Sequence, residues 1–154
     1  MSDVQQIFFG MELGIGEVVQ ILAERLGFTV REFDGSWSVY KQGYGGFDRS
    51  IGGAVEMNEY SYPSPRPDEE RSVYDGYPYC WEIWASVPGT STQQFPLARR
   101  IFDEFVEKVG WPAVLTANIE IVHVRWSPER GLEEFPLNTS TSMDGTDAWG
   151  AGQT

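Results

Sequence analysis

The chain has 154 residues, of which 41% are hydrophobic and 14% aromatic, and its 11 basic against 23 acidic residues give a formal net charge of -12. This length suits one domain with one hydrophobic core, and the aromatic content argues against wholesale disorder. The acid excess disfavours direct binding to nucleic acid or to anionic membranes, because both need clustered cations. The single cysteine, Cys80, excludes an intrachain disulfide and fits a reducing compartment.

The first predicted elements are a strand and a helix. Residues 7–13 are mostly apolar and predict a strand. From Ile15 to Leu26, hydrophobic residues recur at helical spacing with charged and polar residues between them. Gly27 follows as a natural end of the helix, because glycine readily adopts the left-handed conformation of a C-terminal cap. We therefore expect an amphipathic helix after a short first strand.

Three further strands are predicted in the next part of the chain. Residues 28–33 and 37–41 flank Asp34-Gly35, a pair that favours a tight hairpin turn. Residues 54–60 predict another strand, although polar and apolar residues alternate only weakly along it. The proline-rich stretch 62–79 is expected to be a surface loop, because proline cannot donate a hydrogen bond to a neighbouring strand.

The second half of the chain predicts strands on both sides of a helix. Residues 80–87 alternate clearly and are expected to bury one face. The helix is predicted to begin near Pro96, since proline is tolerated in the first turn but costs about 3 kcal/mol in a helix interior. It should end before Gly110, and extended segments are expected at 113–116 and 119–126.

These elements predict an α+β domain with an antiparallel-rich sheet and two helices packed on one face. Residues 1–130 are expected to form this single domain. Residues 131–154 are polar and show no long periodic pattern, so they are expected to be a mobile C-terminal tail. No stretch approaches the ~20 apolar residues of a membrane span, and we expect a cytoplasmic protein.

No motif in the sequence predicts catalysis, a metal site or a cofactor. The lone His123 and the lone Cys80 could act as base and nucleophile only if the fold brought them together. Paired glutamates are expected by chance in so acidic a chain, and the two glycine clusters between residues 43 and 53 lack the lysine of a phosphate-binding loop. We therefore expect a protein that is not an enzyme, while a small enzyme using Cys80, His123 or paired glutamates stays open.

The strongest positive signal is a stretch in which tyrosines and acids are interleaved. Tyrosine is favoured at binding hot spots because it combines a large apolar area with a polar tip. Neighbouring carboxylates can meet the arginine or lysine side chains of a partner. The predicted partner-binding residues are Glu59, Tyr60, Tyr62, Asp68, Glu69, Glu70, Tyr74, Asp75 and Tyr77.

The order of these segments resembles that of small bacterial immunity proteins, especially those paired with toxins exchanged between swarming bacteria. The likeness rests on an opening Ile7-Phe8-Phe9 strand and a helix that ends with the residues from Ala23 to Phe28. It also includes the Asp34-Gly35 hairpin, the aromatic strand from Trp81 to Trp84, and a late helix and strand up to about residue 126. The resemblance implies a cytoplasmic antidote that blocks its toxin by stoichiometric binding, without a catalytic residue.

Two other kinds of binding protein fit the same residues. One is an acidic phage or host regulator that inhibits a nucleic-acid-binding protein. The other is a structural or assembly subunit whose aromatic surface is buried in an oligomer. A strongly acidic chain favours a basic protein partner in either case, because opposite charges speed the encounter. The sequence leaves the partner's identity and the oligomeric state open.

Overall fold

The computed structural model describes residues 4–43, 50–60, 72–85, 91–142 and 145–150. These residues form a mixed fold in which a single eight-stranded sheet is packed against helices, so the predicted α+β class is confirmed. The strands are β1 (Gln5–Phe9), β2 (Thr29–Phe33), β3 (Ser36–Gln42), β4 (Ser50–Met57), β5 (Tyr79–Ala85), β6 (Ala113–Ala117), β7 (Ile121–Ser127) and β8 (Gly131–Glu134). The helices are α1 (Ile15–Leu26), α2 (Ser91–Lys108) and α3 (Thr146–Trp149).

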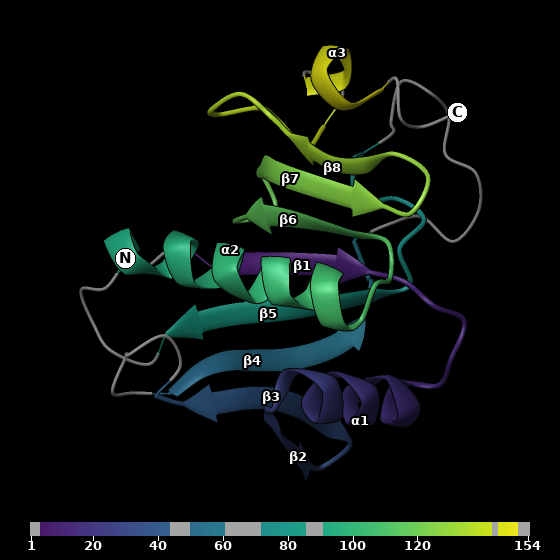
Figure 1. The fold of residues 1–154 in the computed structure, drawn as a ribbon, viewed down its shortest axis with the longest axis vertical. Coiled ribbons are helices and arrows are strands. Elements are labelled where there is room, and N and C mark those ends of the chain that lie inside the picture. The colour runs from purple at the N-terminus through teal and green to yellow at the C-terminus, as the bar shows by residue number, and fades with distance from the viewer. Residues whose placement is uncertain (1–3, 44–49, 61–71, 86–90, 143–144, 151–154) are drawn as a thin grey trace.

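The sheet places the first strand of the chain near its centre. The strand order is β2-β3-β4-β5-β1-β6-β7-β8, and every neighbouring pair is antiparallel (Figure 1). All five residues of β1 are buried, as expected for a strand that pairs with β5 on one side and β6 on the other. The edges of the sheet are formed by β2 and β8.

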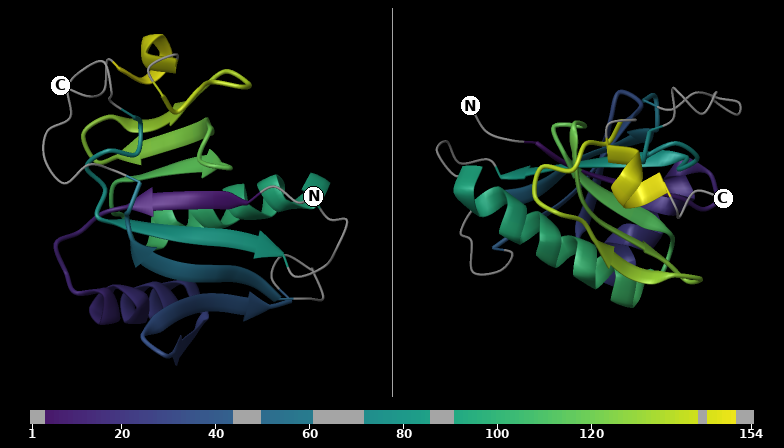
Figure 2. Two further views of the ribbon diagram at one scale, coloured as in Figure 1. Left: turned by 180° about the vertical axis from the view of Figure 1, so that it is seen from behind. Right: turned by 90° about the horizontal axis from the view of Figure 1, so that it is seen from above.

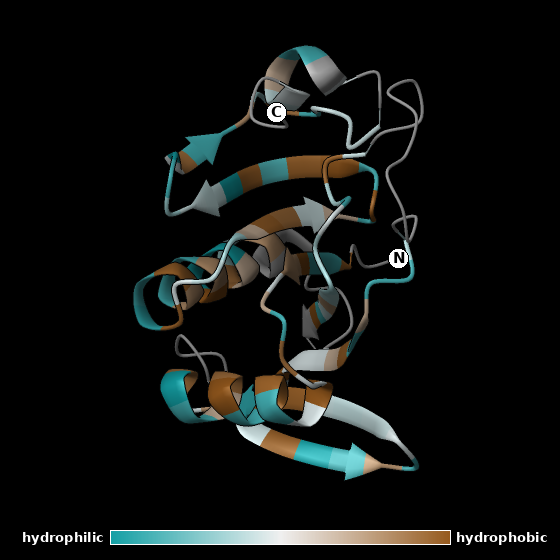
Figure 3. Cartoon of the chain, turned by 90° about the vertical axis from the view of Figure 1, so that its right-hand side faces the viewer, coloured by the Kyte–Doolittle hydropathy of each residue, from teal (hydrophilic) through white to brown (hydrophobic). Residues whose placement is uncertain are grey.

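Helices α1 and α2 lie on the same face of the sheet (Figures 1 and 2). Each helix is amphipathic, and hydrophobic and hydrophilic residues alternate around both in Figure 3. Their apolar sides meet the strands in a large helix-side core, to which β1 contributes Ile7 and Phe9, and β6 contributes Ala113 and Leu115. Fully buried members of this core include Ile7, Phe9, Val18, Leu22, Trp81, Ile83, Ile101, Phe102, Phe105 and Leu115.

The opposite face of the sheet carries a smaller second core. Phe8, Cys80, Val114 and Val122 point from four strands into this cluster. Two segments that are distant in sequence cover it: the turn that contains Val73, and helix α3 with Trp149. Both faces of the central strands are therefore buried, and the helix-side core extends from β2 to β7.

The first helix and the hairpin follow the sequence prediction closely. Helix α1 ends at Leu26, and Gly27 adopts φ 73° with its N–H bonded to the Ala23 carbonyl. Strands β2 and β3 are joined by Asp34 at φ 53° and Gly35 at φ 82°. Positive φ at both turn residues gives the turn whose twist matches that of the flanking strands, so the Asp-Gly signal is confirmed.

Strand β5 alternates as its sequence indicates, but the limits of other strands differ from the predicted ones. Trp81 enters the helix-side core and Cys80 the second core. Strand β1 ends at Phe9 instead of continuing to residue 13. The chain turns away at Gly10, where a Cβ atom would lie 2.5 Å from Pro78 Cδ. This close approach between segments 68 residues apart is invisible in the local sequence.

The predicted start of the second helix is wrong. Helix α2 begins at Ser91, so Pro96 lies inside it. The missing N–H of Pro96 removes one helical hydrogen bond, and we took that cost to exclude an earlier start. Tertiary packing favours the longer helix: Phe95, which precedes the proline, packs against the helix-side core and contacts the His123 ring at a centroid distance of 4.2 Å. The end of the helix is as predicted, with Gly110 at φ 74°.

The described part of the predicted tail belongs to the folded domain. Residues 131–134 form β8, which pairs with β7 at the edge of the sheet. Helix α3 places Trp149 in the second core, where it is 0% exposed and its Nε1–H donates to the Ser140 carbonyl at 2.8 Å. The sequence analysis did not predict β8 or the docking of α3, because this segment is polar overall. A short edge strand and a single buried tryptophan produce no periodic pattern. Residues 151–154 lie outside the described residues.

Candidate functional site

An aromatic stack joins three segments on the second face of the sheet. Phe8 of β1 lies at the base, with the Tyr74 ring stacked on it at a centroid distance of 4.8 Å. Tyr60 meets Phe8 edge-on at 5.9 Å and Tyr74 at 6.3 Å. Phe8 is fully buried, whereas Tyr60 keeps 40% of its surface exposed. The stack therefore presents tyrosine to solvent on a rigid, buried base.

Asn58 holds the two tyrosine-bearing segments together. Its side-chain amide donates to the Tyr74 carbonyl at 3.0 Å and to the Tyr77 carbonyl at 2.8 Å. Its side-chain oxygen accepts the Tyr60 N–H at 3.0 Å, and its own N–H donates to the Pro78 carbonyl at 2.8 Å. Asn58, just beyond β4, thus bonds backbone groups of Tyr60 on one segment and of Tyr74 and Tyr77 on the other. These hydrogen bonds fix the positions of the tyrosines.

Carboxylates surround this stack. Glu56 of β4 is paired in register with Cys80 of β5, and Glu82 lies two residues further along β5 on the same face. Burial raises the pKa of Glu82, and the charge of Glu56 raises it further. The pKa of the Tyr60 hydroxyl is raised by burial and then by electrostatic interaction with Glu82, Cys80 and Glu56. Among the described residues, no lysine or arginine forms an ion pair with Glu56 or Glu82.

We call this region the acidic–aromatic surface, defined by Glu56, Glu59, Tyr60, Tyr74 and Glu82. Three of these residues, Glu59, Tyr60 and Tyr74, are among those predicted from sequence. The other two were missed because only the antiparallel pairing of β4 with β5 brings the carboxylates together. Alternation did place Glu56 and Glu82 on definite faces of their strands, but which strands are neighbours could not be read from one sequence.

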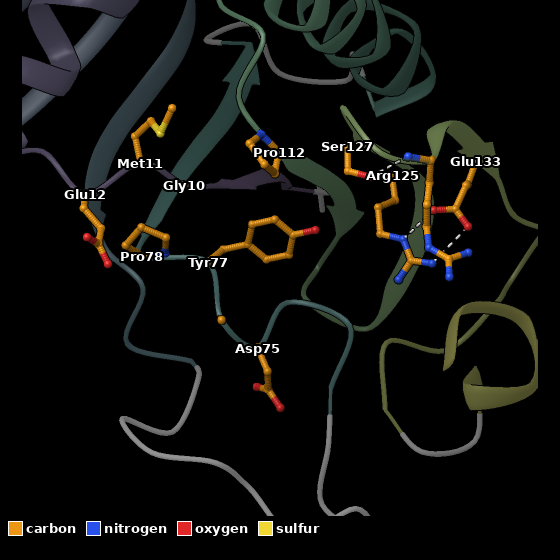
Figure 4. Close-up of a pocket in the computed structure, with 12 residues that line it drawn as sticks. Gly10, Met11, Glu12, Asp75, Tyr77, Pro78, Pro112, Arg125, Ser127 and Glu133 are labelled. Carbon is orange, nitrogen blue, oxygen red and sulfur yellow. Dashed lines mark hydrogen bonds and ion pairs between the residues drawn. The ribbon is translucent and has the colours of Figure 1, made fainter. Parts of the chain in front are cut away.

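The remaining predicted residues divide into two groups. Asp75 and Tyr77 line a cavity next to the surface, on the side of β7 and β8 (Figure 4). The others lie outside the described residues, so their contribution to binding stays a prediction; they are Tyr62, Asp68, Glu69 and Glu70.

The cavity has a volume of about 470 Å³ and lies between the turn of residues 75–78 and the β7–β8 hairpin. Arg125 forms one wall, where its guanidinium makes a two-pronged ion pair with Glu133 at 3.0 and 3.1 Å. The Tyr77 side chain points toward Arg125 (Figure 4). Burial raises the pKa of Tyr77 to about 12, partly offset by the charge of Arg125. Tyr77 therefore keeps its proton at neutral pH and can donate a hydrogen bond.

Cys80 and His123 do not form a nucleophile–base pair. Cys80 is buried in the second core, where burial and the nearby Glu82 and Glu56 carboxylates raise the pKa of its thiol. His123 is the extra residue of a bulge between β6 and β7, and its ring contacts Phe95 of α2 on the opposite face. The sheet separates the two side chains, and the thiol keeps its proton at neutral pH.

The described ranges contain no cluster of three or more His, Cys, Asp or Glu side chains arranged to hold a metal ion. Within the same ranges, none of the helices combines the length and the apolar character needed to cross a bilayer.

The raised pKa of Glu82 predicts how its replacement changes stability. The folded state binds the Glu82 proton more tightly than the unfolded state, so ionising Glu82 costs stability. Glu82→Gln should therefore raise the free energy of unfolding at pH 7. The exposed part of the side chain keeps the gain small, about 0.3–0.5 kcal/mol, or roughly 1–2 °C in Tm.

This gain should shrink as the pH falls through the raised pKa of Glu82 toward the ordinary value of 4.5, because the carboxylate then becomes neutral by itself. Thermal unfolding of both proteins across this pH range measures the effect. Glu32→Gln, at an exposed position on edge strand β2, removes the same charge and serves as the matched control. A gain that grows on acidification would contradict the proposed repulsion.

The chain was compared with protein-family models, curated proteins and solved structures. No family model, no curated protein and no solved structure matches the chain.

Proposed function

We propose that the chain is a cytoplasmic acidic binding protein that neutralises a basic protein partner, namely an immunity protein that blocks a cognate bacterial toxin by stoichiometric binding. The observation that carries the proposal is the acidic–aromatic surface. There, Glu56, Glu59 and Glu82 surround an exposed tyrosine that rests on a buried aromatic base. The resemblance to immunity proteins supplies the toxin as the class of partner.

Among the described residues, no cation forms an ion pair with Glu56 or Glu82. Burial raises the pKa of Glu82 in the free protein, and repulsion by the Glu56 carboxylate raises it further. An arginine or lysine of a partner would relieve that repulsion and form charge-assisted hydrogen bonds. The net charge of -12 adds long-range attraction to any basic surface.

The aromatic part supplies the contact area. Tyr60 is held by the Phe8 and Tyr74 rings, and Asn58 fixes its backbone, so little side-chain freedom remains to be lost on binding. A pre-ordered tyrosine surrounded by acids matches the way hot spots are built: an apolar anchor with polar groups around it. Basic active-site clefts of toxins that attack nucleic acids have the complementary charge.

The experiment takes the proteins encoded by the genes next to that of this chain as toxin candidates and tests each in turn. Expression of the candidate alone should stop growth, and co-expression of this chain should restore it through a complex of fixed stoichiometry. The association rate of the purified proteins should fall roughly tenfold or more when ionic strength rises from about 0.01 M to about 1 M. Rescue without a complex would refute neutralisation by binding, and a salt-independent association rate would refute electrostatic attraction.

A further inference from the structure

Strand β2 leaves one edge of the sheet open. Among the described strands it pairs only with β3 (Figure 1). The two-residue turn between them closes on the pair Phe33–Ser36, which such a turn makes a hydrogen-bonded pair, and bonded and non-bonded pairs alternate along an antiparallel ladder. The N–H and C=O groups of Val30 and Glu32 therefore point away from β3, toward the open edge. An edge of this kind can accept an added strand.

A groove accompanies this edge on the helix side of the sheet. It lies between α1 and the β2–β3 hairpin and has a volume of about 600 Å³. Val30 and Glu32 line it, so the residues whose main-chain groups are open at the edge also direct their side chains into the groove. Its apolar part is held in place, because Phe28 meets the Trp81 ring edge-on at a centroid distance of 5.7 Å and Trp37 packs against the helix-side core. An added strand would thus place alternate side chains on a preformed surface.

The charge of the groove indicates what it can accept. Among the described residues that line it, the charged ones are both carboxylates: Glu24 on α1 and Glu32 on β2, both exposed. Neither forms an ion pair within the described part of the chain. The groove therefore favours a cationic side chain beside the apolar surface of Val30 and Trp37. A second copy of this chain is disfavoured as the occupant, because it would bring its own net charge of -12.

We propose that β2 accepts an extended, basic segment of a protein partner as an added antiparallel strand. The main chain of the segment bonds to Val30 and Glu32, an arginine or lysine opposite Glu32 meets the carboxylates of the groove, and an apolar side chain opposite Val30 lies on its apolar part. Strand β2 is three strands from β5, so this surface is separate from the acidic–aromatic surface and does not rest on the proposed function.

A short peptide of this pattern tests the proposal. Acetyl-Thr-Arg-Thr-Val-Thr-amide places its arginine opposite Glu32 and its valine opposite Val30. At millimolar concentration it should shift amide NMR signals most strongly in β2 and at Trp37. Hydrogen exchange at the Val30 and Glu32 amides should slow several-fold, because these N–H groups become bonded, whereas Arg31 already bonds to β3 and should change less. Absence of binding, or binding without slower exchange at Val30 and Glu32, would overturn the proposal.

Methylated peptides separate main-chain pairing from attraction by charge. N-methylation of the arginine and the valine removes the two amide donors that face β2, and it should abolish binding. N-methylation of the middle and last threonines is the matched control, because their N–H groups point away from the edge, and it should leave most of the affinity. Equal losses in the two methylated peptides would refute strand addition.

The charge requirement is tested from both sides of the contact. Citrulline in place of the arginine keeps the shape of the side chain and removes its charge, so it should weaken binding about 2–5-fold, as expected for an exposed ion pair. Glu32→Gln should remove most of this advantage of arginine. Glu107→Gln takes the same charge from an exposed position on α2 and should leave the advantage unchanged. An advantage that persists in full in Glu32→Gln would contradict a basic segment seated on β2.

A second copy of the chain is the competing occupant of the edge. It predicts a dimer whose Val30 and Glu32 amides exchange slowly without any peptide, and that slow exchange should be lost on dilution. The basic segment predicts fast exchange at both amides in the free protein. Sedimentation velocity and hydrogen exchange over the same range of protein concentration distinguish the two, and a dimer with protected β2 amides would overturn the proposal.

Discussion

Trp149→Ala should lower the free energy of unfolding by about 3–5 kcal/mol, a large share of the roughly 5–15 kcal/mol that stabilises a typical domain. Trp149 is fully buried in the second core with Phe8, Val114 and Val122. Truncation would remove its apolar contacts, leave a cavity under the sheet, and strip the Ser140 carbonyl of the indole N–H that it accepts.

Urea unfolding followed by far-UV circular dichroism measures this loss. Leu137→Ala is the matched control: Leu137 lies in the same C-terminal part of the chain, but it is 85% exposed, so its truncation should change stability by less than about 0.5 kcal/mol. If the two variants unfolded at the same urea concentration as the unaltered protein, residues 145–150 would not be docked on the sheet, and the sequence-based expectation of a tail would be restored.

The C-terminal segment shows where sequence patterns stop being informative. Helix α1 and the β2–β3 hairpin could be predicted because their signals are local: a 3.6-residue repeat with a glycine cap, and an Asp34-Gly35 turn at positive φ. Trp149 has no such local signal. Its place depends on a hollow formed by Phe8, Val73 and Val122, residues that come together only after the sheet has assembled.

Pro96 illustrates the opposite failure, in which a local rule was correct but was outweighed. Proline does remove a helical hydrogen bond, yet α2 extends five residues before it. The ring contact between Phe95 and His123 joins this turn to the bulge in β7. A single sequence shows the cost of the proline but not the contact that offsets it.

The candidate site was only partly predictable for the same reason. Composition pointed to Tyr60 and Tyr74, because tyrosines beside acids are visible in one dimension. The carboxylates of Glu56 and Glu82 are 26 positions apart in sequence and approach only through the β4–β5 pairing. Asn58, which fixes both tyrosine segments, looked like an ordinary polar residue at the end of a strand.

Tyr60→Ala is expected to weaken the complex with the proposed partner by about 30-fold or more, equivalent to at least ~2 kcal/mol. Tyr60 is the exposed member of a stack that Phe8 and Tyr74 hold in place, so its truncation removes contact area that binding would use at little entropic cost. Tyr60→Phe keeps the ring and should retain most of the affinity. The double variant Glu56→Gln/Glu82→Gln should act differently, mainly by slowing association.

Surface plasmon resonance with the toxin candidate separates these effects, because it gives association and dissociation rates individually. Phe33→Ala is the matched control, since Phe33 is a 78% exposed aromatic residue on edge strand β2, three strands from β5. Tyr60→Ala should raise the dissociation rate, and the glutamine pair should reduce both the association rate and its dependence on salt. A complex weakened more by Phe33→Ala than by Tyr60→Ala would move the interface to the β2 edge.

Because Glu82→Gln is expected to stabilise the free protein, a loss of binding in the glutamine pair could not be attributed to unfolding. The same carboxylates would then be shown to cost stability in the free protein and to contribute to recognition in the complex.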